Sequence, residues 1–559
     1  MNANDLHDGS PEFPAAQATA PSGIEGLDHI MFGGYPAGEL TVIRGASGTG
    51  KTMIALAYAS YGGTNSPCVF ASFDEDPRNL ASYFKTRYEK AGVHFLDMRP
   101  PPDAMPAGGE IELGGILIRI DNALKKSGAR RLVLDAVDVL FASFGTGQQI
   151  RQDLSYLMAW CRESGVTVLA SVGVTDDLQE GTSPFDYAAH SVINLRQTVS
   201  SGLMTRVLHV RKRRGGGHGT NEYPFLIDED GVYLDPVTSL RLDAPASLDR
   251  LSTGITDLDR MLGGAGIWVG SALLISGSSG CGKSLLAATL AGKAAASGRK
   301  VLYTSFEEAP NVFVRDIASI GLDFVPLIDS GQLRLVAHRA TECGIEEQLI
   351  KMSRDVAEFE PDIVIIDPIS ALSEITDLHS FKNAILRLIT KKRASGRTVV
   401  MTELIPDHRA GTSALNLSSA VDTWIRLGNR DQNGEQIRTI HIAKSRGTSN
   451  STQVREFIIT SEGLRLEEPY YGSGAMVFGS AKQEQQQHEL REDRRARLRL
   501  SRLKRLLTLA TSLRDSDGDD NRTAVEREII TIETDIAETE AELEDMASAR
   551  QTAQIRRGT

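Results

Sequence analysis

The chain repeats itself at a fixed spacing, and this duplication constrains its fold more than any other feature of the sequence. The segment GASGTGKT at 45–52 recurs 232 residues later as GSSGCGKS at 277–284. The aspartates of the runs LVLDAV and IVIIDP and the pairs Lys212/Arg214 and Lys444/Arg446 follow the same register, and the short segments FDEDP and FEEAP recur at 233 residues. Several separated matches in one register predict two related units of roughly two hundred residues each.

Each unit has the pattern of an α/β domain. Apolar, β-branched runs such as LTVIRG, CVFASF and RLVLDAV alternate with longer amphipathic segments. This alternation predicts βαβ crossovers and a mainly parallel sheet. The polar stretch at 241–250 is the predicted seam, so we expect a first domain at 21–243 and a second at 244–470.

The two ends of the chain differ from these units. Residues 1–20 show no basic start and no apolar run, which predicts a disordered arm rather than a signal peptide or membrane anchor. After a linker at 471–481, residues 482–550 are predicted to form two helices with heptad spacing, followed by a disordered tail at 551–559. On the first helix the expected seam is Leu503, Leu506, Ala510 and Leu513. These helices form either an intermolecular coiled coil, which we favour, or a lone hairpin within one chain.

Composition narrows the class of protein. The net charge of −12 and the pI near 5.5 argue against non-specific binding to nucleic acid, and we expect no nucleic-acid partner. The four cysteines show no CxxC spacing, which indicates reduced thiols rather than a zinc site or a disulfide frame. No apolar stretch is long enough to span a bilayer, so we expect a cytoplasmic protein without membrane association.

The repeated glycine-rich segments match G-x-x-x-x-G-K-[ST], the pattern of a phosphate-binding loop. Backbone N–H groups of such a loop surround phosphate oxygens, its lysine reaches the β- and γ-phosphates, and its last hydroxyl binds Mg²⁺. ATP and Mg²⁺ are therefore the predicted cofactors. The candidate nucleotide-binding residues are Gly45, Ser47, Gly48, Thr49, Gly50, Lys51 and Thr52 in the first half, and Gly277, Ser279, Gly280, Cys281, Gly282, Lys283 and Ser284 in the second.

Aspartates close one apolar strand in each half. Asp135 and Asp367 would emerge at the carboxyl edge of the sheet, beside the magnesium ion held by Thr52 or Ser284. Alternatively, each aspartate only caps the turn that follows its strand. Their shared register with the phosphate loops favours the metal role.

Acidic pairs end a second apolar strand in each half, at Asp74–Glu75 and Glu307–Glu308. At least one member of each pair is a candidate for activating the attacking nucleophile. We also count Glu307 among the candidate metal ligands. The alternative is that these carboxylates only face the positive end of a helix.

Cations recur far from either phosphate loop. Lys212, Arg214, Lys444 and Arg446 lie in strand-then-glycine contexts, and such groups can stabilise the γ-phosphate charge at a neighbouring subunit. A solvated basic edge is the alternative, but two copies at one spacing favour a function in trans, which requires a ring or a filament.

Together these residues resemble the KaiC family, double ATPases with RecA-like domains. The resemblance covers roughly residues 20–470 and includes the paired phosphate loops, the acidic pairs, the K-x-R-G elements, EYPF at 222–225 and REF at 455–457. It implies a homohexameric ring with ATP at subunit interfaces, slow ATP hydrolysis in the first half, and autophosphorylation and dephosphorylation in the second. It also implies that Ser418 and Ser419 are the phosphorylated residues and that Glu307 deprotonates them. Without the resemblance, these two residues would be interpreted as ordinary turn or cap serines.

This sequence departs from the family pattern at three places. The second acceptor is a serine rather than a threonine, and Asp74 replaces a glutamate, so Glu75 is the preferred base in the first half. The longer heptad tail argues against dependence on the activator KaiA. The heptads would instead join two hexamers end to end or regulate the kinase directly. Whether a KaiB-like protein binds the first half is left open.

Two other classes share the phosphate-loop core. A RecA-like DNA motor is disfavoured by the negative net charge, although VRKRRGGGHG is a partial candidate for a DNA loop. Stimulation of ATP hydrolysis by single-stranded DNA would identify a motor. A scaffold that only binds ATP is disfavoured by two complete sets of candidate catalytic residues.

Overall fold

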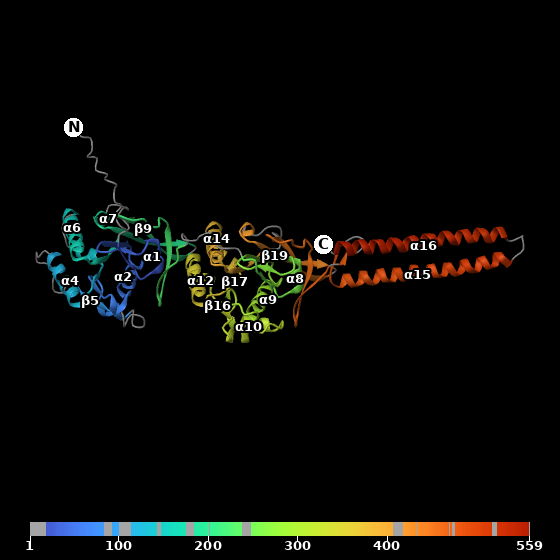
Figure 1. Ribbon diagram of the computed structural model, residues 1–559, viewed down its shortest axis with the longest axis horizontal. Coiled ribbons are helices and arrows are strands. Elements are labelled where there is room, and N and C mark those ends of the chain that lie inside the picture. The colour runs from blue at the N-terminus through green and yellow to red at the C-terminus, as the bar shows by residue number, and fades with distance from the viewer. Residues whose placement is uncertain are drawn as a thin grey trace, which may run out of the picture. The chain divides into compact units, whose positions relative to one another are not determined.

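The structure is a computed structural model that describes residues 18–82, 92–99, 113–141, 147–174, 184–200, 202–236, 247–405, 417–432, 434–468, 470–471, 476–516 and 522–557. By its internal contacts the chain divides into two compact units, which part between residues 242 and 243. Two segments of the second half, 339–358 and 372–391, group with the first unit, which the sequence did not predict. Each half has a nine-stranded sheet flanked by helices (Figure 1).

The first sheet is parallel around its centre and antiparallel at one side. In spatial order its strands are β11 (Gly231–Leu234), β10 (Glu222–Asp228), β9 (Leu203–Arg213), β8 (Ser191–Ser200), β3 (Leu40–Gly45), β7 (Thr167–Gly173), β6 (Arg131–Asp135), β4 (Cys68–Ser72) and β5 (Val93–Asp97). The strands from β8 to β5 pair in parallel, and β9 to β11 add antiparallel hairpins.

The second sheet has the same order, strand for strand. Its strands are β22 (Gly463–Glu467), β21 (Arg455–Thr460), β20 (Glu435–Ser445), β19 (Thr423–Gln432), β14 (Ala272–Gly277), β18 (Thr398–Leu404), β17 (Ile363–Asp367), β15 (Val301–Ser305) and β16 (Leu333–Ala337). The α/β fold class and the duplication are thus confirmed.

Helices follow the strands as expected for crossover connections. Those of the first half are α1 (Glu25–Ile30), α2 (Lys51–Ser60), α3 (Pro77–Ser82), α4 (Leu113–Ser127), α5 (Val137–Phe141), α6 (Gly147–Ser164) and α7 (Pro184–Ala188). Those of the second half are α8 (Thr256–Met261), α9 (Lys283–Ala296), α10 (Pro310–Ala318), α11 (Val325–Asp329), α12 (Ile345–Phe359), α13 (Ser370–Ser373) and α14 (Leu378–Ala394).

The central strands are buried on both faces because helices cover both sides of each sheet. Every residue of β3, β6, β14 and β17 is buried. This explains why these strands read as continuous apolar runs rather than as alternating patterns. The four cysteines are buried and form no disulfide. Within the described residues, no helix is both long and apolar enough to cross a membrane.

Short strand pairs and one long helical pair complete the chain. The pairs are β1 (Thr19–Ala20) with β2 (Tyr35–Pro36), β12 (Arg250–Leu251) with β13 (Ile267–Trp268), and β23 (Tyr470–Tyr471) with β24 (Met476–Val477). Most of the predicted arm at 1–20 lies outside the described residues, but its last two residues form β1.

Two helices, α15 (Gly479–Ser516) and α16 (Arg522–Arg557), run side by side in opposite directions (Figure 1). They begin earlier and end later than predicted. Gly479 and Ser480 donate their backbone N–H groups to Glu456 and Glu435, so tertiary contacts satisfy the first turn of α15. Residues 551–557 contain glutamine, alanine and arginine, which favour continuation of α16 beyond the predicted end at 550.

The seam between the two helices differs from the predicted one. Ala496, Ala510 and Ile529 are buried in the pair, and Lys504 Nζ lies 2.7 Å from Glu540 Oε1 across it. Leu506 and Leu513 were expected in the seam but are 51% and 57% exposed. Ala496, Leu503 and Ala510 are seven residues apart and therefore lie on one face of α15. Leu506 and Leu513 lie beside this face rather than on it. The hairpin within one chain therefore forms, and it leaves leucines uncovered.

Candidate nucleotide sites

A glycine-rich loop joins the central strand to a helix in both halves, β3 to α2 and β14 to α9. Gly50 has a φ of +102° and Gly282 a φ of +98°, which residues with side chains rarely adopt. A Cβ on Gly50 would lie 2.5 Å from Ile227 Cδ1, and one on Gly282 would lie 2.7 Å from Phe457 Cε1. The left-handed φ favours glycine at both positions, and at Gly282 the ring of Phe457 also restricts the space for a Cβ. The loop can therefore present its backbone N–H groups.

The loop lysines fold back onto their own loops. Lys51 Nζ donates to the carbonyl oxygens of Gly45 and Ala46, each at 2.8 Å, and Lys283 Nζ donates to that of Ser278 at 2.7 Å. Burial lowers the pKa of Lys51, and neighbouring carboxylates partly offset this effect. A phosphate offers each ammonium group a charged acceptor in place of these neutral carbonyls, and such hydrogen bonds are stronger.

The predicted hydroxyl and carboxylate ligands meet in the first half. Thr52 Oγ1 lies 3.3 Å from both carboxylate oxygens of Asp135, and Ser171 Oγ donates to Asp135 Oδ1 at 2.6 Å. Asp135 is only 3% exposed, and burial raises the pKa of its carboxyl group. A buried carboxylate beside a hydroxyl at the carboxyl edge of the sheet fits a magnesium ion that keeps water and phosphate oxygens as its other ligands.

The second half gathers the same groups around a cavity of 400 Å³. Lys283, Ser284, Asp367 and the Glu307–Glu308 pair all line it. Asp367 accepts hydrogen bonds from Tyr303 Oη at 2.5 Å and from Thr402 Oγ1. The cavity therefore joins the predicted phosphate, metal and base residues, and this donor set also fits magnesium.

The acidic pairs follow strands that lie beside the aspartate strands. Ser72 on β4 pairs with Asp135 on β6, and Ser305 on β15 pairs with Asp367 on β17. The backbone N–H of Glu75 donates to Ser72 Oγ at 3.2 Å, and that of Glu308 donates to Ser305 Oγ at 3.0 Å. This places the acidic pairs one strand away from the aspartates. Burial, followed by the charges of Asp367 and Asp316, raises the pKa of Glu308.

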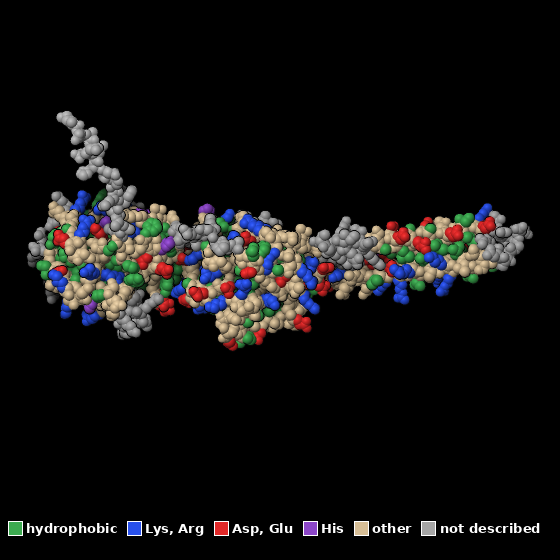
Figure 2. Space-filling view, in the orientation of Figure 1, with side chains coloured by type: hydrophobic (Ala, Val, Ile, Leu, Met, Phe, Trp, Pro, Cys, Tyr) green, Lys and Arg blue, Asp and Glu red, His purple; other side chains and the backbone are tan. Residues whose placement is uncertain are grey.

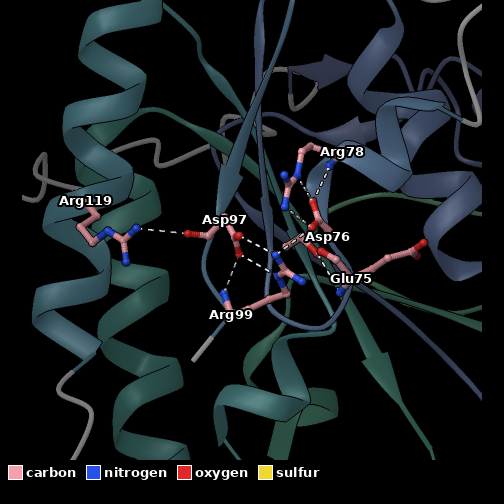
Figure 3. Close-up of polar contacts among 7 residues, drawn as sticks. Glu75, Asp76, Arg78, Asp97, Arg99 and Arg119 are labelled. Atoms are coloured by element: carbon pink, nitrogen blue, oxygen red, sulfur yellow. Dashed lines mark hydrogen bonds and ion pairs between the residues drawn. The ribbon is translucent and has the colours of Figure 1, made fainter. Parts of the chain in front are cut away.

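An ion-pair network holds the acidic loop of the first half (Figure 3). Arg99 Nη2 lies 2.8 Å from Asp97 Oδ2 and 3.1 Å from Asp76 Oδ2, while Arg78 Nη2 lies 2.9 Å from Asp76. Hydrogen bonds from Arg78 lower the pKa of Asp76. Figure 3 shows Glu75 pointing away from these arginines. The network ties the loop after β4 to the end of β5 and leaves Glu75 outside the ion pairs.

The cations predicted to act on a neighbouring subunit, called finger cations below, do not approach the phosphate loop of their own half. They are Lys212, Arg214, Lys444 and Arg446. Lys212 pairs with Val192, which pairs with Val42 of β3, and the backbone N–H of Arg214 donates to the carbonyl of His190 just below. The phosphate loop follows the end of β3. At the rise of a strand the backbone of Lys212, level with Val42, lies ~10 Å before that end, and the backbone of Arg214, near the start of β3, lies ~16 Å before it. Lys444 and Arg446 stand in the same relation to β14.

The predicted acceptor serines lie at the same end of the central strands as the finger cations, near the start of β14. Ser418 and Ser419 end the short 3₁₀ segment Leu417–Ser419, and the neighbouring Asp422 donates its backbone N–H to Ala272 at the start of β14. Arg446 Nη2 donates to the carbonyl oxygen of Ser419 at 2.9 Å. The structure thus joins the acceptors to the finger cations and separates both from the phosphate loop of their own chain.

Sequence reasoning missed Arg438. Arg438 lines the cavity of the second half, and its Nε donates to the carbonyl oxygen of Gly280 at 3.2 Å. The signal was present, because Arg206 precedes it by the repeat spacing of 232 residues. Tyr303, Thr402 and Ser171, which orient the two aspartates, carried no comparable motif.

Comparisons with known proteins agree with this geometry. The family described as "ATPase: KaiC" matches residues 20–239 and again residues 251–470. The chain is 35% identical to "Circadian clock protein KaiC2" of Synechocystis sp. over 82% of this chain and 83% of that protein. It is 30% identical to "Circadian clock oscillator protein KaiC" of Prochlorococcus marinus subsp. pastoris, over 80% of this chain and 91% of that protein.

Both halves of the chain are therefore ATPase domains of one kind, repeated in tandem. The paired loops, the aspartates and the shared strand order provide the structural basis of the match. The protein belongs to the KaiC family.

Proposed function

We propose that this protein is a ring-forming, magnesium-dependent ATPase and serine autokinase with a role in a clock or timer. The first half mainly hydrolyses ATP, and the second half phosphorylates and dephosphorylates Ser418 and Ser419. The clock role rests on the similarity to the clock proteins KaiC and KaiC2, and the homohexameric ring rests on the family resemblance of the sequence.

The hydrogen bond between Arg446 and Ser419 carries the proposal. The finger cation and the acceptor are held together at the edge of the sheet opposite their own phosphate loop. If this end of the sheet packed against the phosphate loop of a neighbouring chain, it would bring Arg446, Lys444 and the acceptor serine to that loop together. We therefore assign phosphoryl transfer to a pair of chains, with ATP between them.

The roles of the second-half residues follow from the cavity. Lys283 would bind the phosphates, while Ser284, Asp367 and Glu307 would hold Mg²⁺, which neutralises phosphate charge when bound. The acceptor hydroxyl of the neighbouring chain attacks the γ-phosphorus, and the bond to the β-phosphate oxygen of ADP breaks. Glu307 or Glu308 takes the hydroxyl proton, and Lys444 and Arg446 stabilise the charge that develops on the γ-phosphoryl group.

The first half carries out the same cleavage with water as the nucleophile. Glu75, or Asp74, would position that water; Thr52 and Asp135 would hold the ion; and Lys212 and Arg214 would act from the neighbouring chain.

Intact-mass and phosphopeptide analysis after incubation with Mg-ATP tests the kinase. Phosphate on Ser418 or Ser419 of the wild type, and none on a Ser418→Ala/Ser419→Ala variant, is the expected result. ATP hydrolysis without phosphate on either protein would leave a tandem ATPase and overturn the kinase assignment.

Co-expression of two tagged variants tests transfer between chains. Lys283→Ala lacks the second-half lysine but keeps the acceptors, whereas Ser418→Ala/Ser419→Ala keeps the lysine and lacks the acceptors. Transfer in trans predicts phosphate on the Lys283→Ala chain in mixed rings and none when that variant is expressed alone. Phosphate on neither chain of a mixed ring would contradict it, provided that the wild type is phosphorylated.

The exposed leucines of α15 support association of chains through the hairpin. Leu506, Leu509 and Leu513 are each more than half exposed. On the face seen in Figure 2, basic side chains gather over α15 and acidic ones over α16, so a second copy could offer complementary charge. We propose that these leucines join two hexamers. Deletion of residues 483–559 should halve the number of chains in the assembly, as measured by light scattering; an unchanged number of chains would refute this role.

A further inference from the structure

The segment that bears Ser419 has a counterpart in the first half, held by the same hydrogen bonds. Arg214 Nη2 donates to the carbonyl oxygen of Tyr187 at 2.7 Å, as Arg446 Nη2 donates to that of Ser419 at 2.9 Å. Each arginine and each bonded residue differ by the repeat spacing of 232.

Further hydrogen bonds repeat in the same register. Lys212 Nζ donates to the carbonyl of Ala189 at 2.8 Å, and Lys444 Nζ to that of Val421 at 2.7 Å. His190 donates its backbone N–H to Leu40 as Asp422 does to Ala272, both at 2.9 Å. The correspondence is therefore one of structure as well as of sequence. Asp186 stands where Ser418 stands, and Tyr187 stands where Ser419 stands.

Asp186 is anchored in a way that Ser418 cannot be. Its carboxylate forms an ion pair with Arg44, in which both side chains are at most one-tenth exposed, and it lies 3.6 Å from Arg211. At the two arginine positions the second half has Ser276 and Ala443. The acceptor segment of the first half is thus tied to the end of β3, and the second half lacks this tie.

Tyr187 fills the place of an acceptor with a larger group. Its side chain is 63% exposed at the edge that carries Lys212 and Arg214. From ordinary bond lengths, a phenol oxygen lies about 4 Å further from the backbone than a serine hydroxyl. A tyrosine ring presented with these cations would therefore occupy the space through which a serine hydroxyl approaches the γ-phosphorus.

We propose that position 187 is the acceptor position of the first nucleotide site, and that its tyrosine reserves the γ-phosphoryl group of that site for water. Tyr187 is then a specificity-determining residue that acts on the nucleotide held by the neighbouring chain. This inference rests on the proposed function, because it requires the finger edge of one chain to face the phosphate loop of the next.

The proposal predicts a gain of function. In a Tyr187→Ser variant, the new hydroxyl attacks the γ-phosphorus of ATP bound to the neighbouring first half, ADP leaves, and the proton passes to Asp74 or Glu75. The substitution is made in the Ser418→Ala/Ser419→Ala background, alone and together with Asp74→Glu, because the second half uses the longer carboxylate Glu307 at that position. Phosphopeptide analysis after incubation with Mg-ATP is the readout.

We expect one phosphoryl group per chain on the peptide around position 187 in at least one of these two variants. Tyr187→Phe and wild type should carry none there. Tyr156→Ser, at another exposed tyrosine of the first half, is the matched control for adventitious phosphorylation and should also carry none. The gained signal cannot arise from misfolding.

Two results overturn the inference. One is the absence of phosphate at position 187 in both serine variants, when they still hydrolyse ATP and the wild type is phosphorylated at Ser418 or Ser419. The other is phosphate on Tyr187 of the wild type, which would make the tyrosine itself an acceptor. Failure of wild-type Ser418 and Ser419 to be phosphorylated would count against the proposed function, and it is measured on a separate peptide.

Discussion

Thr52 Oγ1 stands 3.3 Å from both carboxylate oxygens of Asp135, at the carboxyl edge of the first sheet. Asp135 is buried, and burial raises the pKa of its carboxyl group. Its ionised form is therefore unfavourable in the folded protein when no cation is bound. A group that is unfavourable for folding but well placed for Mg²⁺ is typical of a functional site.

Asp135→Asn should therefore separate activity from stability. We expect ATP hydrolysis by the first half to fall about 100-fold or more, because a neutral amide is a poor magnesium ligand. The melting temperature without nucleotide should not fall. Calorimetry and a phosphate-release assay in a Lys283→Ala background measure both effects. A large loss of stability would show that Asp135 is mainly structural.

The same carboxylate predicts a pH dependence of stability. Because its pKa is raised in the folded state, the folded protein binds more protons than the unfolded protein in a window that begins near 3.8. Stability from this group is complete below that window and is lost as pH rises through the folded-state pKa. Asp135→Asn lacks this loss, so its stability relative to wild type should increase across the window and then level off. A constant difference in urea midpoints across the pH series would contradict the assignment.

The Arg44–Asp186 pair should stabilise the acceptor segment of the first half. Removing either partner leaves a nearly buried charge, so Arg44→Ala or Asp186→Ala should cost about 3 kcal/mol. Arg44→Ser/Asp186→Ser, which installs the residue types found at Ser276 and Ser418, should recover much of that loss. The first unfolding transition in calorimetry is the measurement. A loss in the double variant equal to the sum of the two single losses would mean that the two charges do not compensate each other.

The Arg99 network should influence turnover more than stability. Arg99 joins Asp97 and Asp76 across the loop that carries Glu75, and its loss should lower first-half turnover about 3- to 10-fold by releasing that loop. The side chains of Arg99 and Asp97 are one-third and one-half exposed, so solvent screens their pairing and the melting temperature should change little. Arg78→Ala is the matched control, because Arg78 is 88% exposed and contacts only Asp76 of the two carboxylates. Equal kinetic effects of the two substitutions would refute a specific role for Arg99.

Asp367→Asn should act on the second half alone. Autophosphorylation of Ser418 and Ser419 should be lost, while hydrolysis by the first half continues, because the two sites have separate aspartates. Phosphopeptide analysis and phosphate release from the same samples test this. Loss of both activities would show that the halves depend on each other.

The sequence alone determined the duplication, the α/β class and the residues of the phosphate loops. These features are local, because they depend on residues that are close in the sequence. A glycine at a left-handed φ and an aspartate at the end of an apolar strand are examples. The composition of the tail likewise predicted two helices, since helix propensity and heptad spacing need no partner.

Only the tertiary structure decided which distant groups meet. The predicted finger cations and acceptor serines lie at the end of the central strands opposite their own phosphate loop because β9 and β20 run antiparallel to their neighbours, which no local pattern states. Likewise, Leu506 and Leu513 were placed in the wrong seam because several heptad phases fit one leucine-rich helix, and only packing against α16 selects one. The repeat spacing aligns Tyr187 with Ser419, but only the structure shows that both carbonyls accept the same arginine hydrogen bond, which a backbone carbonyl can do whatever side chain it carries.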